Sequence, residues 1–226
     1  MLSAGGHHRK RDWRSTVSLR HALLAVLTAE PMTGYDLIRY FDGTVEFVWH
    51  APHSQIYPEL RRMEQAGLVE VQVVPRGERA EKRLYSITGE GVRELRSWLG
   101  DISPYQQERD LSRLRAAHFE FSTYEAARNQ LKAHLDHYTR ALGTWERMVE
   151  DIEARRVPLM RQRMKQRPEA EHEGIAAFKR FAFRGEVAKA RAEVAWAEEG
   201  LALLDDLEKK GVPLWSEPDG AAESGG

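Results

Sequence analysis

The stretch His53–Gly67, HSQIYPELRRMEQAG, decides the fold. Its apolar residues Ile56, Leu60 and Met63 are spaced by four and three positions, so they share one face of a helix. Ser54 is a suitable N-cap, and the final glycine suits the position just after a helix C-terminus. The opposite face is polar. We therefore expect a short amphipathic helix with one face in a core and the other open to a partner.

Two further helices are expected upstream. Residues 18–29, SLRHALLAVLTA, have apolar residues at helical spacing, with Ser18 as the cap. Residues 33–43, TGYDLIRYFDG, predict a second helix that Thr33 caps and Gly43 ends. Residues 44–52 then connect this helix to the opening stretch.

Downstream the period changes from helix to strand. Leu68–Val74 alternates and predicts a strand that Pro75 ends. A polar turn follows, and Arg83–Thr88 reads as the returning strand, after which Thr88 caps a helix over residues 89–99. Three helices, a hairpin and a helix are the order of a winged helix-turn-helix domain, which we place at residues 17–100.

The second half of the chain predicts helices. One is expected over residues 106–120, and Ser122 with Glu125 forms a capping box for a long helix that continues to about residue 166. Apolar residues recur along it at spacings of three and four, as in a coiled-coil seam, and Pro158 should kink or break it.

A last helix is expected from about Ile175 to Lys210, with Phe178 and Phe181 in its apolar stripe. Two such helices alone cannot bury their apolar faces, so we expect a second copy of the chain to cover them. We expect a helical dimerisation and effector domain over residues 105–210. Residues 1–16 are expected to be a disordered basic arm, and residues 211–226 a disordered tail.

The chain resembles the PadR family of bacterial transcriptional regulators, in its larger subfamily with a helical C-terminal domain. The matching stretches are TGYDLI at 33–38, QIYPELRRMEQAGLVE at 55–70 and RLYSITGEGVREL at 83–95. The resemblance implies a DNA-binding regulator, expected to be a repressor, that acts as a homodimer on an inverted repeat. The wing tip departs from the family pattern, because Glu78 and Glu81 interrupt its basic residues.

Double-stranded DNA is therefore the expected partner. Gln55 lies in the first turn of the expected reading helix and suits an adenine edge, whereas the arginines that follow suit phosphates. The residues expected to face DNA are His53, Ser54, Gln55, Tyr57, Arg61 and Arg62 in the helix, and Arg76, Arg79, Lys82 and Arg83 in the wing. Packing beneath the wing is the alternative for Tyr57.

Regulators of this family often sense planar aromatic compounds, so the resemblance also implies a small aromatic effector. Its expected walls are Trp49, Trp98, Phe119, Trp145 and Trp196. Aromatic residues at helical spacing are more often packing residues than ligand walls.

Other functions find little support. The chain of 226 residues has no cysteine and carries a net charge of −1, so any basic signal is local. It has no phosphate-binding glycine loop, no nucleophile elbow and no HExxH, so we expect neither an enzyme nor a cofactor. His118, His134 and His137 make a weak metal set.

No stretch approaches the roughly 20 apolar residues of a membrane span, so a cytoplasmic protein without a membrane partner is expected. A protein-binding scaffold, whose winged helix binds no specific DNA, is the alternative that the acidic wing tip favours. A winged-helix regulator of the MarR type is a further alternative with the same class of function.

Overall fold

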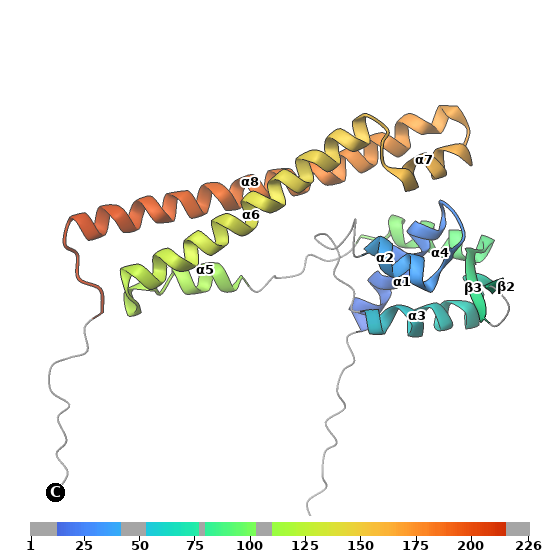
Figure 1. The fold of residues 1–226 in the computed structure, drawn as a ribbon, viewed down its shortest axis with the longest axis horizontal. Coiled ribbons are helices and arrows are strands. Elements are labelled where there is room, and N and C mark those ends of the chain that lie inside the picture. Colours follow the sequence, from blue (N-terminus) through green and yellow to red (C-terminus); the bar gives the residue numbers. More distant parts are fainter. Residues whose placement is uncertain (1–12, 42–52, 77–79, 103–109, 216–226) are drawn as a thin grey trace, which may run out of the picture. The chain divides into compact units, whose positions relative to one another are not determined.

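The structure, a computed structural model, describes residues 13–41, 53–76, 80–102 and 110–215 (Figure 1). It divides into two compact units. The first holds residues 1–103 and 157–175, and the second holds residues 104–156 and 176–226. The segment 157–175 thus groups with the N-terminal half, although its position between two long helices placed it in the expected domain over residues 105–210.

The first unit is a winged helix-turn-helix, as the sequence predicted. Its elements are α1 (Trp13–Leu27), β1 (Met32–Thr33), α2 (Gly34–Tyr40), α3 (His53–Gln65), β2 (Val69–Arg76), β3 (Ala80–Ile87) and α4 (Gly89–Gly100). The strands form one antiparallel sheet in the order β1-β3-β2. The hairpin of β2 and β3 is the wing that follows α3.

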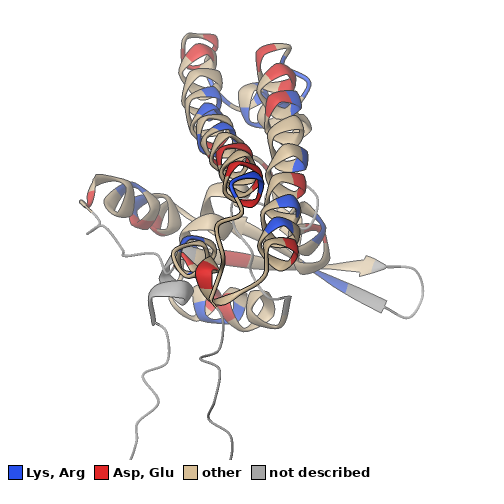
Figure 2. Ribbon diagram, turned by 90° about the vertical axis from the view of Figure 1, so that its left-hand side faces the viewer, with Lys and Arg blue, Asp and Glu red and all other residues tan. Residues whose placement is uncertain are grey.

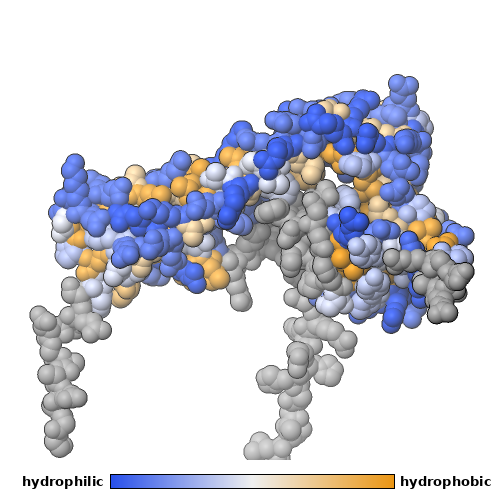
Figure 3. All heavy atoms as spheres, viewed as in Figure 1, coloured by the Kyte–Doolittle hydropathy of each residue, from blue (hydrophilic) through white to orange (hydrophobic). Residues whose placement is uncertain are grey.

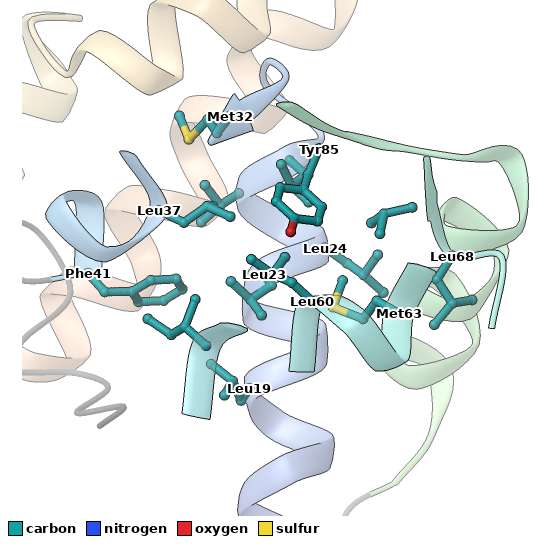
Figure 4. Close-up of a cluster of buried hydrophobic side chains, with 14 of the residues drawn as sticks. Leu19, Leu23, Leu24, Met32, Leu37, Phe41, Leu60, Met63, Leu68 and Tyr85 are labelled. Atoms are coloured by element: carbon teal, nitrogen blue, oxygen red, sulfur yellow. The ribbon is translucent and has the colours of Figure 1, made fainter. Parts of the chain in front are cut away.

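The core of this unit is assembled around α1 and α3. Ile56, Leu60 and Met63 of α3 are fully buried and belong to one cluster with Leu23 and Leu24 of α1 (Figure 4). The same three residues defined the apolar face in the sequence. Their burial fixes the opposite face of α3 toward solvent, because side chains four and three apart share one side of a helix.

Several boundaries differ from the expectation. The first helix begins at Trp13, not at Ser18, so part of the expected arm is helical. The helix α3 begins at His53, so Ser54 lies inside it and is not its cap. Pro75 belongs to β2 instead of ending it. Since β2 is an edge strand, a missing N–H can face solvent without breaking the sheet.

Two predicted caps are confirmed. The Thr33 hydroxyl accepts the backbone N–H of Asp36 at 3.2 Å, and the Asp36 carboxylate accepts the Thr33 N–H in return. The Thr88 hydroxyl accepts the Gly91 N–H at 3.0 Å at the start of α4. Gly67 follows α3 with φ of +68°, which is the left-handed geometry expected there. The strand β1 was not predicted, because two residues are too few to show the alternation that indicates a strand.

The break at Pro158 is also confirmed. The long helix α6 (Tyr124–Glu153) ends before it, and α7 (Pro158–Lys165) starts with Pro158 in its first turn, where a missing N–H costs least. Leu159 joins the core of the first unit, and the Arg163 guanidinium donates to the Ala25 carbonyl near the end of α1. These contacts explain why α7 groups with the N-terminal half.

The second unit is a long antiparallel helix pair. It contains α5 (Leu111–Ala116), a 3-10 turn at Phe119–Phe121, α6, and most of α8 (His172–Lys209), which follows a second 3-10 turn at Glu169–Glu171. In the seam, Trp145 of α6 lies with Val187 and Ala190 of α8 in one buried cluster. Leu131 and Leu204 lie in another.

Two details of this unit correct the sequence interpretation. Thr123, not Ser122, caps α6, because its hydroxyl accepts the Ala126 N–H at 3.1 Å. Phe178 and Phe181 are each 78% exposed in the protomer instead of lying in the seam.

The surface of the helix pair is mixed in character. Acidic and basic residues are interspersed along the long helices (Figure 2), and hydrophobic residues interrupt their hydrophilic surface (Figure 3). Within the part of the chain that the structure describes, no helix is both long and apolar enough to cross a bilayer.

Candidate nucleic-acid interface

The solvent-facing side of α3 carries the expected reading residues. The side chains of Ser54, Gln55, Tyr57, Arg61 and Arg62 are all exposed. His53 is the first residue of the helix, and its side chain lies outside the described part of the structure. The burial of Ile56, Leu60 and Met63 therefore leaves one polar strip of α3 exposed to solvent, as the sequence predicted.

An open groove of about 440 Å³ runs beside this strip. Its walls are Tyr57 and Arg61 of α3, Lys82, Arg83 and Tyr85 of β3, and residues 33–36 at the start of α2. Three basic side chains and three tyrosines thus line one concave surface. The contribution of α2 was not predicted, because no sequence spacing connects residues 33–36 with the wing.

Two roles were considered for Tyr57 from the sequence, namely contact with DNA and packing inside the domain, and its position in the structure is compatible with both. Its ring lies so close to Gly34 that a Cβ atom at position 34 would overlap it. The side chain is nevertheless 46% exposed, so it packs on α2 with one edge and faces the groove with the other. A tyrosine in this position can donate its hydroxyl to a phosphate while its ring fixes the distance between α2 and α3.

Tyr85 forms the floor of the groove. It is only 3% exposed, and burial raises the pKa of its hydroxyl above the ordinary value, against a smaller opposing effect of Arg83. The phenol therefore stays neutral at physiological pH and presents a hydrogen-bond donor rather than a negative charge.

The four arginine and lysine candidates with described side chains fall into two classes. Arg83 donates from Nη2 to both carboxylate oxygens of Glu64, at 2.7 and 2.6 Å, and so attaches the wing to α3. Arg62 donates to the buried carboxylate of Glu59 at 2.8 Å. Arg61 and Lys82 form no hydrogen bond or ion pair with any residue that the structure describes.

This division matters for anion binding. A cation that already holds a carboxylate must give up that partner before it binds a phosphate, whereas an unpaired cation exchanges only water and counterions. Arg61 and Lys82 are therefore better suited to bind a phosphate than Arg62 and Arg83. Asp36 also lines the groove, and its carboxylate accepts hydrogen bonds from the Thr33 hydroxyl at 2.7 Å and from the Thr33 N–H. These neutral donors leave its negative charge in place, so Asp36 opposes an anion at that end of the groove.

The wing tip is outside this description. Arg76 ends β2 opposite Ala80, but its side chain, the whole of Arg79 and the side chain of Glu81 lie outside the described residues, as does Glu78. The expected basic arm also lies there, apart from the backbone of its last residues in α1. Their roles toward DNA stay predictions.

The expected effector residues do not form one group within either unit. Trp98 stacks on His21 within the first unit, with ring centroids 4.6 Å apart. Trp145 is buried beside Phe183, and Phe119 and Trp196 pack around a different core cluster. Trp49 lies outside the described residues. The four described aromatic residues pack within their own units, and a role toward an effector stays a prediction.

The three histidines that form only a weak metal set in the sequence each have other partners in the structure. His134 pairs with Glu193 at 3.1 Å, while His118 lies near Glu120 and His137 makes an edge-to-face contact with Tyr138. Among the described side chains, no three histidine or acidic residues form a group suited to a metal ion.

Comparisons with known proteins agree with this geometry. Residues 23–97 match the Transcriptional regulator PadR-like family. Over 81 residues the chain is 37% identical to the Negative transcriptional regulator PadR of Bacillus subtilis, which covers 36% of this chain and 44% of that protein. A probable transcriptional regulator of Mycobacterium tuberculosis, Rv1176c, is 37% identical over 89 residues, or 39% of this chain and 47% of that protein. The chain thus matches less than half the length of these curated relatives.

Solved structures resemble a larger part of the chain. Bacillus subtilis PadR in complex with operator DNA superimposes with a TM-score of 0.64 and 25% identity, over 83% of this chain and 99% of that one. The same protein in complex with p-coumaric acid gives a TM-score of 0.63 at 23% identity, over 87% and 98%. The second similarity establishes the fold alone.

Proposed function

The chain belongs to the PadR-like family of transcriptional regulators, and we propose that it binds operator DNA through α3 and the adjoining groove. Its relatives are regulators of transcription and not enzymes. The observation that carries the proposal is the pair of unpaired cations, Arg61 and Lys82, beside the exposed strip of α3.

The strip and the groove have different tasks in this proposal. Gln55 lies in the first turn of α3 and reads a base edge in the major groove, where glutamine suits adenine. Arg61, Lys82 and the Tyr57 hydroxyl bind phosphates and set the depth at which α3 enters. The ion pair between Arg83 and Glu64 holds the wing beside the helix.

The proposed active form is a homodimer. On the helix pair, Val149 and Val187 lie in an open groove whose rim carries the ion pairs Glu146–Arg191 at 2.7 Å and Glu153–Arg184 at 3.1 Å. Such a mixed surface suits a second copy of the same helices, because apolar residues at its centre are surrounded by charges of both signs. Two copies of α3 would then meet an inverted repeat whose half-sites lie about 34–36 Å apart.

Repression and its relief complete the proposal. The Bacillus subtilis relative is a negative regulator and has been solved with p-coumaric acid, so we infer that this chain represses transcription and responds to a small aromatic ligand. A ligand achieves this only if it binds more tightly to a form in which the two copies of α3 no longer match the operator.

Fluorescence anisotropy tests the proposal with duplex DNA from upstream of the protein's own gene and with an unrelated duplex of equal length. Each is titrated at about 50 and about 200 mM salt, since phosphate contacts make affinity fall with salt. The expected result is tighter binding to the upstream duplex, with two protomers per site and a steep salt dependence.

Equal and weak binding to both duplexes would reject this operator. A subsequent selection from random DNA that enriched no sequence would reject the proposed function and favour the protein-binding scaffold. Such a scaffold binds its partner through apolar helices, with little dependence on salt.

A further inference from the structure

The reading helix contains a carboxylate that is fully removed from water. The side chain of Glu59 is 0% exposed, although its neighbours in α3 at positions 57, 58, 61 and 62 are all exposed. It accepts hydrogen bonds from Arg20 Nε of α1 at 2.9 Å and from Arg62 Nη1 at 2.8 Å. A buried carboxylate is tolerated only with such partners, because removal from water costs several kcal/mol.

Arg61 and Arg62 are neighbours in sequence but have opposite situations. Successive residues of a helix point about 100° apart, so the two side chains leave α3 on different flanks of the exposed strip. Arg61 lines the groove beside the wing without an ion-pair partner among the described residues. Arg62 leaves toward α1 and meets the carboxylate that also holds Arg20.

We propose that Glu59 is a specificity-determining residue that never touches DNA: it withholds Arg20 and Arg62 from the phosphates and fixes α3 on α1. The inference rests on the proposed function. Phosphate contacts supply non-specific affinity, whereas base contacts made by a correctly placed helix supply discrimination. Holding two arginines away from the DNA backbone lowers the non-specific affinity without weakening the base contacts. The ratio of specific to non-specific affinity therefore rises.

The same arrangement has an energetic reason. Two guanidinium groups share one carboxylate, so each is held less firmly than in a separate pair, yet neither can leave without uncovering a buried charge. The side chains of Arg20 and Arg62 are 28% and 50% exposed, respectively, which leaves their far edges near solvent. If Glu59 lost its charge, both arginines would become free cations next to the reading helix.

The first test compares Arg61→Gln with Arg62→Gln, which change the charge equally at adjacent positions of one helix. Arg61→Gln should reduce the slope of log affinity against log salt by about 1 on both operator and unrelated duplex. Arg62→Gln should leave the slope on unrelated duplex unchanged, because Arg62 makes no phosphate contact. An equal loss of slope in the two variants would overturn the inference.

The second test is Glu59→Gln, which keeps the size of the side chain and removes its charge. Arg20 and Arg62 are then released, so binding to unrelated duplex should tighten several-fold at low salt, and the slope should steepen by up to about 1.8. The specificity ratio should fall. Glu90→Gln is the matched control, since it frees Arg93 on α4 with the same charge change away from the groove.

The outcomes separate the two proposals. If the unaltered protein does not prefer any operator, the proposed function fails before the variants are compared. If it does prefer one, and Glu59→Gln is folded by circular dichroism but binds unrelated duplex no better than Glu90→Gln, the inference about Glu59 is wrong. If Glu59→Gln does not fold, the comparison of Arg61→Gln with Arg62→Gln still decides.

Discussion

Gly34 and Tyr57 are in direct contact across the helix-turn-helix: a methyl group at position 34 would overlap the Cε1 atom of the tyrosine ring. The contact joins the first turn of α2 to the exposed side of α3. It explains why a glycine follows the capping residue Thr33, although a residue with a higher helix propensity would stabilise α2 more. Tyr57 can lie at the groove in this position because Gly34 has no Cβ atom.

Substitution of this glycine should displace the tyrosine. We expect Gly34→Ala to destabilise the protein by about 1–3 kcal/mol through overpacking and to weaken operator binding by more than its effect on stability explains. Urea unfolding and anisotropy measure the two effects. Gly89→Ala is the control, because a Cβ atom there would meet only the end of the Arg93 side chain. Equal affinity losses in both variants would refute the role of the contact.

The contact of α7 with the first unit predicts a stability effect. Leu159 is 8% exposed within the N-terminal core, so Leu159→Ala should cost about 2–4 kcal/mol by removing buried methyl groups. Leu99→Ala, at a side chain that is 69% exposed, should stay within about 0.5 kcal/mol of the unaltered protein. Chemical unfolding of the full chain measures both, and similar costs would mean that α7 is not part of this core.

Arg113 predicts a third effect, on the attachment of α5. No residue of α5 is buried, but Arg113 pairs with the buried Glu193 of α8 at 3.1 Å and lies 4.8 Å from the ring centre of Trp196. Arg113→Gln leaves Glu193 with His134 alone, so we expect a loss of about 1–3 kcal/mol, above that of an exposed pair. Arg115→Gln on the same helix should cost less than about 0.5 kcal/mol.

Hydrogen exchange distinguishes local loss of α5 from global unfolding in these variants. Faster exchange confined to residues 111–116 in Arg113→Gln, but not in Arg115→Gln, is the expected pattern. Exchange that is unchanged in both would show that other contacts hold α5.

The pH dependence of α5 follows from Asp110. The backbone N–H of Arg113, followed by its guanidinium, lowers the pKa of this carboxyl below its ordinary value of 3.8. A lowered pKa in the folded state means that the cap stabilises the helix fully above the ordinary value and is lost as the pH falls through the folded one. Protection of the Arg113 amide should therefore be constant from neutral pH to about 5 and decrease only below about 4.

Asp110→Asn provides the control for this titration. The amide oxygen can still accept the Arg113 N–H, but it does not titrate, so the decrease at acid pH should disappear. A decrease that persists in Asp110→Asn would show that Asp110 does not cause it.

The sequence by itself determined most of the helices and strands of this protein and their order, but not the short strand β1. The spacing of Ile56, Leu60 and Met63, the alternation of the wing strands, and the caps Thr33 and Thr88 are local properties, because a helix face, a strand face or a cap depends on residues a few positions apart. The effect of Pro158 is local too, because proline lacks a backbone N–H, so the sequence predicted the break after the long helix. These patterns were enough for the winged helix, the helix pair and the identity of the exposed strip on α3.

Only the tertiary structure decided which charged residues are available. Arg62, Arg83 and Arg61 look alike in the sequence, but the first two meet buried or neighbouring carboxylates while the third does not. The partners Arg20 and Glu59 are 39 positions apart, and Arg113 and Glu193 are 80 apart. No periodic pattern relates such distances. Helix spacing relates Glu59 to Arg62, three positions later, but it does not show that Glu59 is buried or that Arg20 also donates to it. Ion pairs between distant segments form where packing brings those segments together, so the tertiary structure decides which cations stay unpaired.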